Sequence, residues 1–317
     1  MLTNNLPVRF RRLVWLTLVF NFLVIIWGGF VSASGSGDGC GASWPLCPNI
    51  VDDETLWQTV VEFTHRLTSG LALLLVVGTY LWSRRLWPDG SLPRKAAGWA
   101  LIFMVIESLL GASLVLFQWV DTNESVARAF VQPVHLTNTL LLSGAIAAIL
   151  WGQHLQSDWW ARYGRLLVLA LLGLVVVSSF GTFASLASTI FPSESFFEGV
   201  QKDFAGDSHY LVRLRIWHPA LALLLGLGLW RLVARLEASA GARQLSALAW
   251  NVQMLYWLQF GLGALNAILL TPVWLQMVHL ALAHLLWLGL VALAYRSAAA
   301  MADTSVLMAG KAGTVAG

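Results

Sequence analysis

Residues 166–189, with the sequence LLVLALLGLVVVSSFGTFASLAST, contain no charged side chain. Residues 13–33, LVWLTLVFNFLVIIWGGFVSA, form a second uncharged run. An apolar run of about 20 residues has the length of a helix that crosses the hydrocarbon core of a bilayer. These two runs therefore predict membrane-spanning helices and place the chain among membrane proteins.

The composition of the whole chain agrees with this class. Of the 317 residues, 58% are hydrophobic and only 11% are charged, and the mean hydropathy is +0.71. A water-soluble domain of this length needs more charged residues to cover its surface. The 17 tryptophans suit membrane interfaces. The formal net charge of +3 is small, and nothing in its distribution indicates nucleic-acid binding.

The hydropathy pattern predicts eight spans and therefore an all-α polytopic membrane protein. The expected spans cover residues 13–33, 60–82, 96–119, 131–152, 165–188, 212–236, 246–270 and 274–295. The first span is too long for the apolar region of a cleavable signal peptide and follows three arginines. We therefore interpret it as a signal anchor.

Basic residues concentrate at alternate ends of these spans. They are Arg9, Arg11, Arg12, Arg84, Arg85, Arg94, Lys95, Arg162, Arg165, Arg231, Arg235, Arg243, Arg296 and Lys311. The first loop on the other side contains acidic residues and no lysine or arginine. Because positive charge favours the inner side, we expect a bacterial cell-membrane protein with both termini in the cytoplasm.

The chain also repeats itself. The matching segments are Gln132-Pro-Val-His135-Leu and Gln276-Met-Val-His279-Leu, Thr64-His65-Arg66 and Trp217-His218-Pro219, and Leu110-Gly111-Ala112 and Leu262-Gly263-Ala264. Each half has four spans, so both halves share one orientation. The sequence therefore predicts two tandem four-helix bundles, residues 1–155 and 156–317, related by a pseudo-two-fold axis along the membrane normal.

Four histidines begin the spans that enter from the outer side, so they lie at one depth: His65, His135, His218 and His279. Ionisable residues inside a membrane are costly and usually functional, although four separate interhelical hydrogen bonds are an alternative. Two imidazoles from facing helices can take both axial positions of a haem iron, whereas zinc needs about four ligands. The pattern favours one haem in each half.

Charged residues accompany these histidines. Arg66, Arg128, Arg213 and Arg215 lie near the outer helix ends, where they suit haem propionates or snorkel to the interface. Glu62 lies three residues before His65 on the same helical face, and its counterpart in the repeat is Arg215. A carboxylate there can relay protons or stabilise a developing cation, or it is a helix-end charge. The contrast suggests one haem that reacts and one that carries electrons.

The remaining candidates are two cysteines and two buried polar residues. Cys40 and Cys47 lie in the Gly-rich first outer loop, where an oxidising compartment predicts a disulfide; a stapling and a redox role both stay open. Glu107 aligns with Gln259 and is either a hydrogen-bonded core carboxyl or part of a proton path. His284 lies on another face than His279 and is not expected to be a ligand.

Taken in order, these motifs resemble the haem A synthase family from the first span to the last. The motifs are Gly28-Gly29, Cys40…Trp44-Pro45…Cys47, Glu62-Phe-Thr-His65-Arg66, His135, His218 and His279. The chain departs from the family at Val31-Ser-Ala-Ser34, where an arginine and a threonine are common, and at Glu107, where a glutamine is usual. Its third outer loop, residues 190–211, also lacks a cysteine pair.

The resemblance implies a membrane oxidoreductase acting on a CH3 group. It implies that the C8 methyl of haem O is hydroxylated twice, and that the geminal diol loses water to give haem A for terminal oxidases. His65 and His135 would hold this substrate, His218 and His279 a resident haem b, with Arg66 and Arg215 nearby and Glu62 at the reacting centre. Implied partners are the haem O synthase and membrane lipid. The resemblance does not identify the electron donor or acceptor or the source of the oxygen atoms. It also does not determine the oligomeric state, and a homo-oligomer is one possibility.

Two other functions compete with this one. A non-catalytic di-haem b-type cytochrome passing electrons from quinol explains the four histidines but not Glu62. A transporter built on a parallel repeat needs polar or broken helices in mid-membrane, and apart from Glu107 the sequence has few such features.

Overall fold

The computed structural model describes residues 6–47, 56–151, 164–237 and 243–315, and within them the regular structure is helical, with no β-strand. The helices are α1 (Val8–Ala33), α2 (Leu56–Leu86), α3 (Leu92–Leu116), α4 (Val126–Trp151), α6 (Arg165–Ile190), α7 (Phe196–Phe204), α8 (Tyr210–Leu214), α9 (Trp217–Glu237), α10 (Arg243–Ile268) and α11 (Val273–Val315).

Seven helical segments of this part of the chain are long and apolar enough to cross a membrane. They are α1, α2, α3, α4, α6, the combined stretch Tyr210–Glu237 and the α11 segment Val273–Ala298. The expected all-α polytopic membrane protein is therefore confirmed. The seventh predicted span, residues 246–270, coincides with α10, which is a long helix but is not among the seven. Its amide side chains explain the lower hydropathy: Gln244, Asn251, Gln253, Gln259 and Asn266.

The sixth predicted span differs from the expected single helix. The structure divides it into the five-residue α8 and the longer α9, with the break just before Trp217. Pro219 lies in the first turn of α9, where the missing N–H of proline costs no helical hydrogen bond. Because of this break, His218 lies at the very start of α9 rather than inside a continuous helix.

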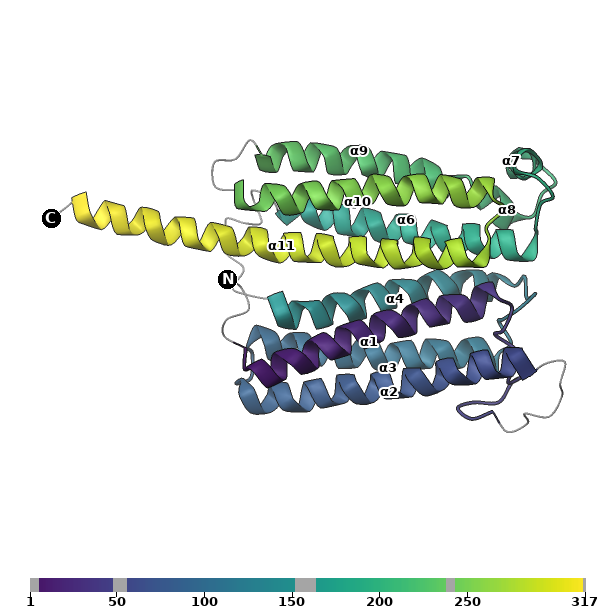
Figure 1. Cartoon of the computed structure of the whole chain (residues 1–317), viewed down its shortest axis with the longest axis horizontal. Coiled ribbons are helices and arrows are strands. Elements are labelled where there is room, and N and C mark those ends of the chain that lie inside the picture. Colours follow the sequence, from purple (N-terminus) through teal and green to yellow (C-terminus); the bar gives the residue numbers. More distant parts are fainter. Residues whose placement is uncertain (1–5, 48–55, 152–163, 238–242, 316–317) are drawn as a thin grey trace.

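The long helices lie in two neighbouring groups (Figure 1). The first group contains α1 to α4, and the second group contains α6, α9, α10 and α11. Contacts of α4 with α6 and α11, and of α1 with α11, join the two groups. The short helices α7 and α8 lie at the same end of the molecule as the loop that follows α1 (Figure 1).

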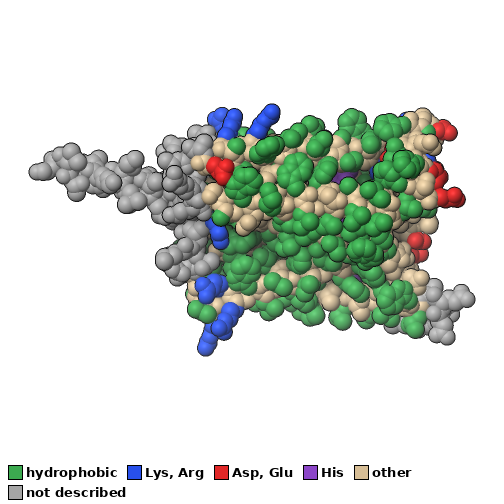
Figure 2. Space-filling view, turned by 45° about the horizontal axis from the view of Figure 1, so that its top comes forward, with side chains coloured by type: hydrophobic (Ala, Val, Ile, Leu, Met, Phe, Trp, Pro, Cys, Tyr) green, Lys and Arg blue, Asp and Glu red, His purple; other side chains and the backbone are tan. Residues whose placement is uncertain are grey.

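Each group has its own apolar core. Phe10, Val14 and Ile146 are buried in the first group, and Leu167, Leu236 and Leu286 are buried in the second. On the face seen in Figure 2, large apolar side chains form a broad band between the two ends of the molecule. On this face, lysine and arginine gather at one end, while most aspartate and glutamate lie at the other (Figure 2). An apolar belt between charged ends is the surface expected of a protein surrounded by lipid.

Candidate functional site

The four histidines predicted as ligands lie on four different helices and form two pairs. His65 belongs to α2, His135 to α4, His218 to α9 and His279 to α11. The ring centroids of His218 and His279 are 6.2 Å apart, and the ring planes make an angle of 79°. His65 lies within electrostatic reach of His135. The fold therefore provides one histidine pair within each helix group.

Each of these imidazole rings packs against a glycine on a neighbouring helix. A Cβ atom added to Gly28, Gly181 or Gly263 would lie 2.8–3.0 Å from Cε1 of His65, His218 or His279, respectively. At Gly111 the added atom would lie 3.8 Å from Nε2 of His135. The two shortest of these distances are closer than real Cβ atoms approach, so a larger residue would displace the ring. Three of the four glycines thus leave space that a side chain would fill, whereas a Cβ at Gly111 would make only an ordinary van der Waals contact.

The histidine pairs suit a haem iron better than a metal ion held by protein ligands alone. Among the described residues, no three or more His, Cys, Asp and Glu side chains gather as metal ligands, whereas zinc takes about four. Metal–imidazole bonds are about 2 Å long, so a ring separation near 6 Å leaves room for one metal between two imidazoles. The 6.2 Å separation of His218 and His279 meets this requirement.

Hydrogen bonding of the rings agrees with this arrangement. Nδ1 of His218 lies 2.9 Å from the carbonyl oxygen of Val177. A carbonyl partner assigns the ring proton to Nδ1 and leaves the lone pair of Nε2 for a metal. Nδ1 of His65 and Nδ1 of His279 are buried and have no partner among the described groups. The site thus contains polar atoms whose hydrogen-bonding capacity is not satisfied by the described protein groups.

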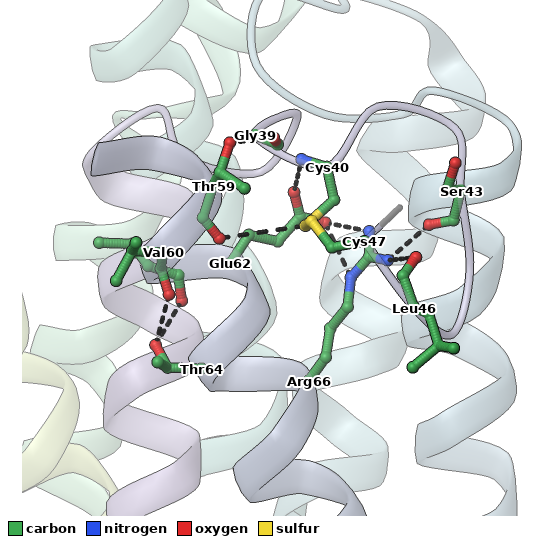
Figure 3. The surroundings of a disulfide bond; sticks show 11 residues. Gly39, Cys40, Ser43, Leu46, Cys47, Thr59, Val60, Glu62, Thr64 and Arg66 are labelled. Atoms are coloured by element: carbon green, nitrogen blue, oxygen red, sulfur yellow. Dashed lines mark hydrogen bonds and ion pairs between the residues drawn. A yellow bond between two sulfur atoms is a disulfide. The ribbon is translucent and has the colours of Figure 1, made fainter. Parts of the chain in front are cut away.

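Glu62 is buried beneath the first outer loop (Figure 3). Its Oε2 accepts a 2.7 Å hydrogen bond from the backbone N–H of Cys40, and its Oε1 accepts a 3.1 Å bond from Nε of Arg66. Arg66 also donates from Nη1 to the carbonyl oxygens of Ser43 and Leu46. Backbone and side-chain donors from two segments therefore hold the carboxylate one helical turn before His65.

The loop itself is closed and fastened to α2. A disulfide joins Cys40 and Cys47, as the sequence predicts, with their Cα atoms 5.1 Å apart. The hydroxyl of Thr59 donates to the carbonyl oxygen of Gly39. A Cβ atom at Gly39 would overlap the backbone of Gln58. Glycine is needed here because the loop backbone contacts the backbone of α2, and this contact delivers the Cys40 N–H to Glu62.

Arg215, the counterpart of Glu62, has a different set of partners. Its Nε donates to Oδ1 of Asp203 at 2.7 Å, and Nη2 donates to the carbonyl oxygen of Gly199 at 2.8 Å. Burial raises the pKa of the Asp203 carboxyl, and the hydrogen bond from Arg215 opposes this rise. Arg215 therefore ties α7 to the start of α9. The cation that the sequence contrasts with Glu62 is paired with a carboxylate, as Glu62 itself is paired with Arg66.

Glu107 lies beside the first histidine pair. Its Oε1 is 3.6 Å from Nε2 of His135 and accepts a hydrogen bond from the hydroxyl of Thr139 at 2.5 Å. Its Oε2 accepts a 2.6 Å bond from Nδ2 of Asn138. The expectation of a hydrogen-bonded core carboxyl is confirmed, and the contact with His135 was not foreseen. Its counterpart Gln259 donates from Nε2 to the carbonyl oxygen of His279 at 2.8 Å.

The structure describes two further histidines, His209 and His284. His284 is buried in α11 against Phe22, with ring centroids 5.8 Å apart. It thus contacts α1 of the first group. His209 caps α8 through Nδ1, which accepts from the N–H of Leu211. His154 lies outside the described residues.

Gly181 and Asp203 were missed by sequence reasoning. Gly181 was detectable, because Gly28 and Gly181 are separated by 153 residues, the same offset that separates His65 from His218. The pairing of Asp203 with Arg215 had no sequence signal of this kind, because the loop that contains Asp203 has no counterpart of similar sequence in the first half.

Comparisons with known proteins agree with these features. Residues 49–291 match the family model COX15-CtaA, described as cytochrome oxidase assembly protein. The chain is 42% identical over 294 residues to a Thermus thermophilus protein named protoheme IX farnesyltransferase, a match that covers 90% of this chain and 48% of the relative. It is 42% identical over 94 residues to a heme A synthase of Symbiobacterium thermophilum (30% and 31% covered). It is 34% identical over 140 residues to the heme A synthase of Geobacillus thermodenitrificans, a match that covers 43% of this chain and 42% of the relative. The chain thus spans about half the length of its Thermus relative.

Proposed function

Because the chain belongs to the COX15-CtaA family of cytochrome oxidase assembly proteins, we propose that it is a haem A synthase, which oxidises the C8 methyl of haem O to the formyl of haem A. The observation that carries this proposal is the histidine pair in each helix group, with a carboxylate fixed one turn before His65. The relatives named heme A synthase support the same activity.

In this proposal the two helix groups have different tasks. His65 and His135 bind haem O as the substrate, and His218 and His279 bind a resident haem b. When bound, the resident haem supplies one-electron redox chemistry. The protein orients the ligands: the carbonyl of Val177 holds the ring of His218 in place. Gly28 leaves room for the ring of His65.

Glu62 is proposed to act at the reacting centre. A carboxylate beside the substrate accepts or relays a proton, or stabilises positive charge that develops on the methyl carbon. Its two donors, the Cys40 N–H and Arg66, fix the direction of its oxygens. Its exposed fraction is only 3%, so little water competes for those oxygens. A fixed, dry carboxylate is what transition-state stabilisation requires.

Arg66 and Arg215 are proposed to contribute to haem binding at the outer ends of the helices. Both guanidinium groups already have protein partners. Arg66 donates to Glu62 and to carbonyl oxygens of the loop. Arg215 donates to Asp203 and to the carbonyl oxygen of Gly199. A haem propionate would therefore share these donors with the existing partners. The same arginines also hold the outer loop and α7 in place, and this makes both segments part of the haem surroundings.

We further propose that α10 crosses the membrane with the seven apolar helices, giving eight spans in two four-helix halves, residues 1–155 and 156–317, related by a pseudo-two-fold axis. Support comes from the position of α10 beside α9 and α11. Glu107 and Gln259, which align in the repeat, also each contact a histidine of their own group. The charge separation in Figure 2 supports a cytoplasmic side at the lysine- and arginine-rich end of a bacterial cell membrane.

The source of the substrate follows from the Thermus relative. That protein is named for protoheme farnesylation, and this chain matches only 48% of it. If the matched part corresponds to the haem A synthase, the prenyl transfer belongs to the remainder. We therefore propose that this chain receives haem O directly from a haem-prenylating partner. Transfer along the membrane suits a farnesylated, lipid-soluble substrate.

Analysis of the extracted haems tests the function. The protein is expressed with and without a haem O source, and its haems are separated and weighed by mass spectrometry. We expect haem A, or its hydroxylated precursor, only when haem O is supplied. Haem b alone in both sites, although haem O is supplied, would instead support the electron-transferring di-haem cytochrome.

A further inference from the structure

Glu107 is the unexplained charged group closest to a histidine pair. It reaches from α3 to α4, where Asn138 and Thr139 hold both carboxylate oxygens. Nδ2 of Asn138 also donates to the carbonyl oxygen of Phe103, one turn before Glu107 on α3. Asn138 and Thr139 are buried, with exposed fractions of 6% and 4%. The carboxylate is therefore fixed 3.6 Å from the ring of His135.

The second helix group has the same architecture without the charge. Glu107 lies four residues before Gly111, and Gln259 lies four residues before Gly263. Gln259 donates to the backbone carbonyl of His279, so it also lies beside a histidine of its own group, although this contact is with the backbone and not with the ring. A carboxylate in one half is thus replaced by an uncharged amide of nearly the same shape in the other.

In the part of the chain that the structure describes, no arginine or lysine forms an ion pair with Glu107. Glu62 is paired with Arg66 and Asp203 with Arg215. Within the described residues, the basic group in contact with Glu107 is the ring of His135, whose Nε2 lies 3.6 Å from Oε1. Asn138 and Thr139 hold its two oxygens in place. A low-dielectric interior makes such a charge effective over several ångströms.

We propose that Glu107 is a positioning residue that lowers the reduction potential of haem bound at His65 and His135 relative to haem bound at His218 and His279. This inference rests on the proposed function, because it requires haem at both pairs. Ferric haem carries one more positive charge than ferrous haem, so a fixed carboxylate beside its ligand stabilises the ferric form. Gln259 has no such effect. This carboxylate-for-amide exchange therefore contributes to a difference in reduction potential between the two halves.

A reciprocal exchange tests the proposal in the purified, haem-loaded protein. A redox titration monitored through the haem absorption bands yields one midpoint potential for each haem. In a His218→Ala protein, which should lack the second-group haem, the remaining midpoint potential belongs to the first-group haem. Glu107→Gln should raise the first-group midpoint and leave the second unchanged. Gln259→Glu should lower the second-group midpoint and leave the first unchanged. Glu107→Asp, which keeps the charge, should restore a midpoint close to that of the wild type.

The outcomes separate this inference from the function on which it rests. Unchanged midpoints in both Glu107→Gln and Gln259→Glu would overturn the inference, even with normal haem content and normal haem A formation. If the Glu107→Gln protein loses its first-group haem, the midpoint potential of the Gln259→Glu protein decides the question, because Gln259→Glu does not alter the first group. Absence of haem from the first pair in the wild type would instead contradict the proposed function.

Discussion

Glu62 depends on atoms from two segments of the chain, the outer loop through the Cys40 N–H and its own helix through Arg66. Neither contact is conferred by the Glu-x-x-His spacing itself. The spacing only places Glu62 and His65 on one face of α2. The contacts turn a helix-end carboxylate into a buried group of defined orientation, and this is the feature on which the proposed chemistry relies.

Replacing Glu62 by glutamine should reduce haem A formation by about 10²- to 10⁴-fold, the usual contribution of a group that transfers a proton in the transition state. The amide is nearly isosteric, so the fold and the haem of the second group should persist. Haem A formation is measured by mass analysis of extracted haems. Glu198→Gln, at an exposed ion pair with Lys202 on α7, is the control and should leave the rate unchanged. Wild-type conversion by Glu62→Gln would show that this carboxylate is a helix-end charge.

The space left by glycine should be as important as the ligands themselves. In Gly263→Ala the new methyl group would lie 2.8 Å from Cε1 of His279, and overpacking of this kind costs about 1–3 kcal/mol. We expect lower haem content in the second group. Gly261→Ala, two residues away, has nothing within 4 Å of the new atom and should keep its haem. Equal haem contents in the two variants would refute the role assigned to Gly263.

Removing a ligand should have a local effect. His218→Ala and His279→Ala should each abolish the bis-imidazole absorption spectrum of the second-group haem, because one imidazole alone leaves an axial position open. The first-group haem should stay, since its histidines come from α2 and α4. Haem content and spectra of the purified variants measure this. Normal haem b in both variants would contradict the ligand assignment.

At the scale of elements, the outer loop and α7 are held by similar means. An arginine near a histidine donates to backbone carbonyls of a surface segment: Arg66 to the outer loop and Arg215 to α7. In the first group the disulfide additionally closes the loop. The loop is thus a structural support for Glu62, and its integrity should influence activity without any change in the helices.

A Cys40→Ser, Cys47→Ser double variant should bind haem normally but convert haem O more slowly, because the loop no longer holds the Cys40 N–H against Glu62. In wild-type protein purified without reductant, both cysteines should resist thiol labelling until they are reduced. If the disulfide only supports the loop, reduction of the wild type should lower conversion as much as the double substitution does. A double variant as active as the wild type would show that the loop needs no covalent closure.

At the scale of the whole molecule, the charges define two ends. Asp89 lies in the connection between α2 and α3, and Asp207 lies in the connection between α7 and α8. With the proposed orientation, they face the cytoplasm and the outside, respectively. Because Cys40 and Cys47 are the only cysteines and are paired, single cysteines can report this topology without background.

An impermeant maleimide should label the Asp207→Cys protein in intact cells and label the Asp89→Cys protein only after the membrane is opened. The physical reason is the excess of arginine and lysine at the Asp89 end, which favours the cytoplasm. The degree of labelling is measured by gel shift or mass spectrometry. The reverse pattern would invert the proposed topology and place the histidine pairs near the inner face.

The sequence alone determined the membrane class, the approximate spans and the register of the four histidines. These features depend on local hydropathy and on a repeat, and both can be read along the chain. The seventh predicted span is the exception, because α10, which contains several amides, is not among the seven helices apolar enough to cross a membrane. The glycine at position 181 could also have been found from the repeat offset.

Only the tertiary structure decided which atoms meet. The Cys40 N–H reaches Glu62 because a glycine loop packs on α2, Arg215 meets Asp203 because α7 folds back, and Glu107 reaches His135 because α3 packs on α4. Such contacts depend on how helices and loops pack across long sequence separations, and hydropathy carries no information about that packing. The sequence therefore identified the chemical groups of the site, whereas packing determined their partners.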